Sequence, residues 1–350
     1  MNNNKKVFIS GIYGQLGSLT ADYLLKNTDY DIIGGTYWHD TSINNIIYIK
    51  DNPRFQRIDF DLNNYHSICT SISTIKPDYF INFAGKSFVG ESWENPLKFM
   101  DVATSTINIL ENIKTHCPNC RFFNAGSSEE FANVKYSPQD ENHPLSPKNP
   151  YGVNKATQRL IINSYRDQYN LYVVHGIIYN SESYRRSDKF ISRKITKGVA
   201  KIKKSLLTNT PFDSLSVGNI NSSRDWSDAE DIVEGIWKML NQETPNNYVL
   251  SSDKSHTVKE FIELAFKYAN INGVWHGHGE NEEFSITTSD AKKYSPYNSV
   301  LVKINPKFYR PIENKPLVGY SKLARKELNW VPKTSFEDLI QKMIFYDLNN

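Results

Sequence analysis

The first 180 residues alternate short apolar runs with stretches of helical periodicity. Apolar runs bounded by glycine or polar residues are typical of buried strands. They occupy residues 7–10, 31–37, 55–60, 78–83, 121–125 and 171–178. Helical patterns lie between them, notably at 17–26, 95–114 and 151–169. Strands separated by helices at this spacing form βαβ units, so the sequence predicts an α/β fold with a doubly wound parallel sheet.

A glycine-rich turn joins the first predicted strand to the first predicted helix. Its sequence is Gly11-Ile12-Tyr13-Gly14-Gln15-Leu16-Gly17. Two of the glycines let the backbone turn tightly and approach a pyrophosphate, and the third lets the helix pack closely on the strand. The helix N-terminus then supplies free N–H groups and the positive end of a dipole. We therefore expect a Rossmann-type domain whose cofactor is bound by Gly11, Tyr13, Gly14, Gln15, Leu16 and Gly17.

Further cofactor contacts are expected where other strands end. Asp61 follows the third strand and can hold an adenine, although an aspartate here can also simply cap a turn. The second strand should end with an acid for NAD or an arginine for NADP, and the chain offers Trp38 and His39 instead. The residues alone leave that choice open. The predicted cofactor set is completed by Trp38, His39, Asp61, Leu62, Ala84, Tyr151 and Lys155.

A tyrosine and a lysine stand four positions apart in the pattern Tyr151-x-x-x-Lys155. On a helix they share a face, so the lysine ammonium favours the phenolate form of the tyrosine. Ser127, Ser128 and Glu129 follow the fifth strand, at the sheet edge where ligands of such folds bind. We predict that these five residues are catalytic. Glu129 can remove a proton from a carbon beside a ketone, or it can be a solvated loop acid.

Beyond residue 180 the sequence pattern changes and predicts a mixture of short strands and helices, including a basic helix at 190–204. We expect residues 1–180 to form the cofactor-binding domain and 181–350 to form mainly a smaller substrate-binding lobe, with some later segments returning to the sheet. A net charge of +3 gives no reason to expect nucleic acid as a partner. We expect no membrane span, no metal and a cytoplasmic location, because long apolar runs are absent and three cysteines form no disulfide framework.

The chain resembles the extended short-chain dehydrogenases/reductases, and within them the GDP-mannose 4,6-dehydratase family, from Gly11 to about Pro332. Ser127-Ser128-Glu129 is similar to that family's Thr-Ser-Glu, and the segments at 178–196, 218–226 and 308–313 are similar to its nucleotide-sugar site. Two departures stand out. Glu130 and Phe131 replace a usual apolar residue and tyrosine, and Trp38-His39 replaces an arginine pair. The resemblance implies that the GDP-sugar is bound by Ser87, Asn180, Lys194, Arg224, Arg310 and Glu313.

The resemblance also implies an activity. Tyr151, assisted by Lys155 and Ser127, would deprotonate the hydroxyl at sugar carbon 4 while hydride passes to NADP, with NAD as the alternative cofactor. Glu129 would remove the proton from carbon 5, and water would leave from carbon 6 with help from Glu129 or Ser128. Alternatives are a GDP-heptose 4,6-dehydratase and a 4-keto reductase or epimerase; Glu129 argues against an epimerase. A homodimer or homotetramer is expected, with contacts through the helices at 95–114 and 151–169.

Overall fold

The computed structural model describes residues 4–37, 43–294, 296–309 and 316–350. Up to residue 178 its elements are β1 (Lys6–Ser10), α1 (Gln15–Asn27), β2 (Asp31–Thr36), η1 (Ile43–Ile46), β3 (Phe55–Asp59), α2 (Tyr65–Ile75), β4 (Tyr79–Asn82), α3 (Glu91–Glu94), α4 (Pro96–His116), β5 (Arg121–Ala125), η2 (Ser128–Phe131), α5 (Pro150–Tyr169) and β6 (Val173–Ile178).

The later elements are β7 (Asn180–Glu182), α6 (Ile191–Thr208), β8 (Leu215–Val217), β9 (Ser223–Arg224), β10 (Trp226–Asp228), α7 (Ala229–Leu240), β11 (Tyr248–Leu250), β12 (His256–Thr257), α8 (Val258–Tyr268), β13 (Gly273–His276), η3 (Gly279–Asn281), β14 (Glu283–Ile286), α9 (Thr288–Tyr294), β15 (Val300–Ile304), η4 (Pro306–Phe308), α10 (Lys322–Glu327) and α11 (Phe336–Asn349).

The central feature is a parallel sheet with the strand order β11-β6-β5-β4-β1-β2-β3. Every pairing within it is parallel. The order reverses between β4 and β1, so a crevice opens at the carboxyl ends of these two strands. The expected α/β fold with a doubly wound parallel sheet is confirmed. All six strands expected before residue 180 are present, and β11 adds a seventh from a distant segment.

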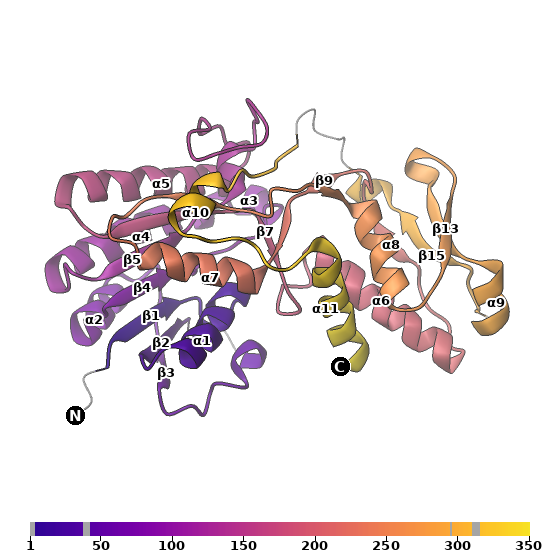
Figure 1. The fold of residues 1–350 in the computed structure, drawn as a ribbon, viewed down its shortest axis with the longest axis horizontal. Coiled ribbons are helices and arrows are strands. Elements are labelled where there is room, and N and C mark those ends of the chain that lie inside the picture. The colour runs from indigo at the N-terminus through magenta and orange to yellow at the C-terminus, as the bar shows by residue number, and fades with distance from the viewer. Residues whose placement is uncertain (1–3, 38–42, 295, 310–315) are drawn as a thin grey trace. The chain divides into compact units, whose positions relative to one another are not determined.

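Helices cover both faces of this sheet (Figure 1). One face packs against α2, α4 and α5, through a cluster that includes Phe80 and Phe122 of the strands and Leu110 of α4. The other face packs against α1 and α7, through a cluster that includes Ile9, Ile81 and Ile236. Because the strands are buried on both faces, they have continuous apolar runs rather than alternating ones.

The described chain divides into two compact units. The first holds the parallel sheet and combines residues of 1–181, 229–253 and 317–332. The second combines residues of 182–228, 254–316 and 333–350, and its sheet has the order β13-β14-β15-β8. Helices α6, α8 and α11 contribute to the core of this second unit. The binding roles expected for residues 1–180 and 181–350 remain a prediction.

Among the described residues, no helix is both long enough and apolar enough to cross a bilayer.

Candidate active site

The glycine-rich turn forms a tight cradle at the end of β1. Gly11 has φ +71°, in the left-handed region, and a Cβ placed on it would lie 2.9 Å from the Ala84 backbone nitrogen. Only glycine suits this position. Helix α1 begins at Gly14, and no side chain caps its first turn. The turn therefore leaves backbone N–H groups for an anionic ligand, as the sequence predicted.

A pocket of about 680 Å³ opens beside this turn. The predicted cofactor residues that line it are Gly11, Tyr13, Gly14, Asp61, Leu62 and Ala84. Thr36, Tyr37, Lys86 and Lys98 also line it and were not predicted. Thr36 could have been found, because it ends the second strand beside the crevice.

Three residues of the glycine-rich turn that were predicted to bind the cofactor are absent from the described lining of this pocket, as are Tyr151 and Lys155. The Gln15 side chain donates to the Ser181 carbonyl oxygen (2.9 Å), and Leu16 packs against the core. Gly17 lies so close to the turn that a Cβ on it would be 2.3 Å from the Gly11 carbonyl oxygen. These residues shape the turn, and the pocket wall is made by their neighbours. Trp38 and His39 lie outside the described residues.

Tyr151 and Lys155 lie on the first turns of α5, on the same face. Tyr151 is 8% exposed, and the Lys155 ammonium lies 5.8 Å from the centre of its ring. The ammonium donates to the Ala125 carbonyl oxygen at the end of β5 (2.6 Å). Burial lowers the pKa of Lys155 to about 8, against the opposing effect of Glu130. The arrangement places a cation beside a phenol, which favours the phenolate.

The predicted serines and glutamate open η2, directly after β5. The Ser127 hydroxyl caps η2 by accepting from the Glu129 backbone N–H (3.2 Å), and it keeps a hydrogen to donate. Ser128 is buried, and Glu129 is half-buried. Ser127 N also donates to the carboxylate of Glu130 (2.9 Å). Two reciprocal hydrogen bonds therefore stabilise the start of η2.

Asn149 connects Glu129 to the helix that bears Tyr151. Its side-chain nitrogen donates to Glu129 Oε2 (2.7 Å), and its side-chain oxygen accepts from Gly152 N (2.8 Å). Asn149 is thus the N-cap of α5 and a fixed partner of Glu129 at once. The sequence analysis missed it. Its signal was an asparagine directly before Pro150, a frequent arrangement at a helix start.

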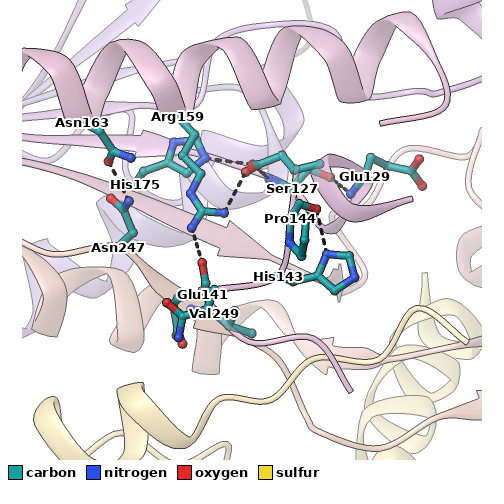
Figure 2. A network of polar contacts seen from close by, with 12 residues as sticks. Ser127, Glu129, Glu141, His143, Pro144, Arg159, Asn163, His175, Asn247 and Val249 are labelled. Atoms are coloured by element: carbon teal, nitrogen blue, oxygen red, sulfur yellow. Dashed lines mark hydrogen bonds and ion pairs between the residues drawn. The ribbon is translucent and has the colours of Figure 1, made fainter. Parts of the chain in front are cut away.

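Glu129 and Glu130 point to different surroundings. Glu130 is fully buried, and it accepts from His175 Nε2 (2.8 Å) and lies 3.8 Å from Arg159 Nη1. Figure 2 shows Arg159 and His175 facing the same point, whereas the carboxylate of Glu129 extends away from them. Of the two adjacent acids, only Glu129 is partly exposed, and its catalytic role stays a prediction.

Comparison with known proteins shows the family of this chain. A family model described as GDP-mannose 4,6 dehydratase matches residues 8–343. The chain belongs to the GDP-mannose 4,6-dehydratase family. The GDP-mannose 4,6 dehydratase of Drosophila melanogaster is 35% identical over 358 residues, covering 99% of this chain and 87% of that protein. The resemblance stated from the sequence is therefore confirmed.

Two solved structures have the same fold as this member of the GDP-mannose 4,6-dehydratase family. The dTDP-glucose 4,6-dehydratase of Bacillus anthracis in complex with NAD has a TM-score of 0.78 at 19% identity, covering 99% of this chain and 97% of that one. The RMD protein of Pseudomonas aeruginosa complexed with NADPH has a TM-score of 0.75 at 17% identity, covering 99% and 100%.

The residues that the family resemblance assigns to the nucleotide sugar are spread over the chain. Ser87 is exposed in the loop after β4, and Asn180 begins β7. In the second unit, the Lys194 ammonium lies 4.5 Å from the centre of the Phe308 ring, and burial lowers its pKa. Arg224 is exposed and donates to the Ser223 carbonyl oxygen (2.7 Å). Arg310 and Glu313 lie outside the described residues.

The described residues hold no group of three or more His, Cys, Asp and Glu side chains placed to bind a metal. The pair Cys117 and Cys120 at the end of α4 is free of disulfides, and Cys120 is buried.

Proposed function

We propose that this protein is a GDP-mannose 4,6-dehydratase, converting GDP-mannose to GDP-4-keto-6-deoxymannose with loss of water. The observation that carries the proposal is the link between Glu129 and the N-cap of α5. A short-chain reductase needs the Tyr151–Lys155 pair, but a dehydratase also needs a base for a sugar carbon. Asn149, two residues before Tyr151, holds such a base at the start of α5. The family match over residues 8–343 supports the same reaction.

A nicotinamide cofactor fits the residues present. The cradle at Gly11 and the uncapped start of α1 suit a diphosphate, and the pocket beside them continues to Asp61 and Ala84. When bound, the cofactor would supply hydride acceptance and return. We propose NADP, because the Lys98 cation lines this pocket and can pair with an extra phosphate. NAD is the alternative, since one fold neighbour carries NAD and the other NADPH.

The protein's own part is proton transfer and orientation. Tyr151, whose phenolate form the Lys155 cation favours, takes the proton of the hydroxyl at carbon 4. The Ser127 hydroxyl orients the oxygen of that hydroxyl. Glu129 takes the proton of carbon 5, which the neighbouring ketone acidifies. The hydroxyl at carbon 6 leaves as water after accepting a proton from Glu129 or Ser128.

Recognition of the GDP part is assigned by family likeness. Cations such as Lys194 and Arg224 suit a diphosphate, and a carboxylate such as Glu313 suits the N–H donors of guanine. Asn180, Ser87 and Arg310 complete the proposed set. We further propose that the protein works in the cytoplasm, in keeping with its free cysteines.

Assembly through α4 and α5 is also proposed. The two helices pack against each other, and they leave large apolar side chains exposed. These are Leu97, Ile107, Val153 and Leu160. Exposed apolar groups on adjoining helices suit a contact with a second copy, in a dimer or tetramer.

The test of function is incubation with GDP-mannose and catalytic NADP or NAD, followed by mass spectrometry. A product lighter by one water, formed without net cofactor reduction, is expected. If neither cofactor gives a product, GDP-mannose is not the substrate, and a GDP-heptose is the next compound to try.

Glu129→Gln tests the assignment of the base. In this variant the rate of dehydration is expected to fall by at least about 100-fold, which is the usual contribution of a general base. Its affinity for the cofactor should stay unchanged. Asp140→Asn is the matched control and should keep full turnover; Asp140 is a half-buried acid in the following loop that accepts from the Tyr136 hydroxyl. Full turnover in Glu129→Gln would remove Glu129 from the scheme.

A further inference from the structure

A polar ladder crosses the apolar sheet, at or next to the carboxyl ends of β1, β4 and β5 and in the middle of β6. Adjacent strands β1, β4, β5 and β6 place one polar residue each in register: Ser10, Asn82, Asn124 and His175. All four are at most 3% exposed. Buried polar side chains in an otherwise apolar layer cost free energy unless each is hydrogen-bonded, so the ladder must satisfy itself.

The ladder has a direction, because each group donates to the next one along. The bonds run from Ala84 N to Ser10 Oγ (3.2 Å), from Ser10 Oγ to Asn82 Oδ1 (2.6 Å), from Asn82 Nδ2 to Asn124 Oδ1 (2.9 Å), from Asn124 Nδ2 to His175 Nδ1 (3.2 Å), and from His175 Nε2 to Glu130 Oε1 (2.8 Å). Hydrogen bonds aligned in this way polarise one another. Their donors all point toward the Glu130 carboxylate and therefore stabilise a negative charge there.

Burial and the bond from Asn124 both favour the neutral form of His175. Burial lowers the pKa of His175, and its Nδ1 accepts from Asn124, which leaves the proton on Nε2. His175 therefore acts as a donor to Glu130 and does not cancel its charge. The absence of a side chain at Gly126 allows His175 and Glu130 to approach each other, since a Cβ there would lie 2.2 Å from His175 Nε2 and 2.7 Å from Glu130 Oε1.

The carboxylate of Glu130 acts electrostatically on Lys155, where it opposes the lowering of the pKa by burial. Lys155 and Glu130 bind the same short segment after β5, one through the Ala125 carbonyl oxygen and the other through Ser127 N. The titratable groups around Lys155 are Tyr151 and Arg159 of its own helix, Glu130 of η2 and His175 of β6. Of these, Glu130 is the anion that opposes the burial of the ammonium.

We propose that Glu130 is a positioning residue: its buried carboxylate, held by the ladder through His175, fixes the Ser127 turn and supplies the counter-charge that keeps Lys155 cationic beside Tyr151. The role of Lys155 rests on the proposed function. Position 130 of this chain carries an acid. With an apolar side chain at position 130, the lowering of the Lys155 pKa by burial would have no opposing charge from this position.

The direct test is the titration of Lys155 by NMR, with ¹³C-labelled lysine and the signal assigned by its loss in Lys155→Met. In Glu130→Gln the pKa of Lys155 should fall by about one unit, the usual effect of losing one nearby opposite charge. Glu141→Gln is the matched control, because Glu141 lies in the same polar region but bonds Val249 N (2.7 Å). The control should titrate like the wild type.

A pKa of Lys155 that is equal in Glu130→Gln and the wild type overturns the proposal, provided that circular dichroism shows both folded. If Glu130→Gln does not fold, His175→Leu serves instead. That variant removes one donor to the carboxylate, so the pKa of Lys155 should fall in the same direction, and an unchanged value overturns the proposal.

The titration needs no turnover, so its result is independent of the substrate. Where the wild type dehydrates GDP-mannose, the alkaline limb of its pH–rate profile should move to lower pH in Glu130→Gln by the same amount as the pKa. An inactive wild type would refute the proposed function, while the titration would still decide the role of Glu130.

Discussion

Gly126→Ala tests the close approach on which the buried Glu130–His175 pair depends. A Cβ at this position would lie 2.2 Å from His175 Nε2, 2.7 Å from Glu130 Oε1 and 2.8 Å from the Gly176 carbonyl oxygen. The last of these is backbone in a central strand and cannot rotate away. The side chains of the pair must therefore separate, or β5 and β6 must move apart.

The cost has two parts. Forcing an extra carbon into a packed interior costs about 1–3 kcal/mol. Breaking a buried hydrogen bond to a charged group costs about 1.5–3 kcal/mol more. We expect the free energy of unfolding to fall by about 4 kcal/mol. For a unit of this size, about 2–4 °C is lost per kcal/mol, so the melting temperature should fall by about 10 °C.

The assay is thermal unfolding followed by circular dichroism, with Gly198→Ala as the control. Gly198 lies inside α6, and a Cβ there would meet only the Leu215 side chain, at 2.8 Å. Alanine is a better helix former than glycine by about 1 kcal/mol, which offsets this contact. The control should therefore melt within about 3 °C of the wild type. A melting temperature of Gly126→Ala equal to that of the control would refute the packing argument.

Two further predictions follow from the site and the surface. Turnover of the wild type should fall as pH rises through about 8, because the pKa of Lys155 is lowered to that value and the cation is lost above it; a rate that stays constant to pH 9.5 would contradict this. Sedimentation should give at least a dimer, through the apolar side chains exposed on α4 and α5; a monomer at micromolar concentration would refute that assembly.

Periodicity was enough to predict the sheet, because a doubly wound sheet buries its strands on both faces and makes them continuously apolar. The six predicted apolar runs are strands β1 to β6 in the structure, each within two residues of its predicted bounds. Strand β11 was different. It is three residues long, Tyr248–Leu250, and it pairs with β6 from about 70 residues away, which no local pattern encodes.

The closeness of the residues predicted to be catalytic could be expected for a different reason. Tyr151 and Lys155 are joined by helical spacing, and Ser127 to Glu129 follow a strand directly, so both groups lie in local sequence. The bond between Asn149 and Glu129 joins residues 20 positions apart across an irregular loop. Loop paths are not fixed by periodicity, and this contact could only be seen in the structure. The polar ladder lies between these cases: Ser10 and Asn82 end their strands, whereas His175 interrupts an apolar strand.

The two adjacent glutamates show why a sequence pattern assigns residues but not their surroundings. In a 3₁₀ turn, successive side chains point about a third of a turn apart, so Glu129 and Glu130 must face different neighbours. Glu129 meets the N-cap of α5, and Glu130 meets His175. Replacing one member of the buried pair by an apolar residue leaves the other unsatisfied, at about 1–3 kcal/mol, whereas replacing both is nearly neutral. The acid at position 130 and the histidine on β6 are therefore a single feature, and neither is explained without the other.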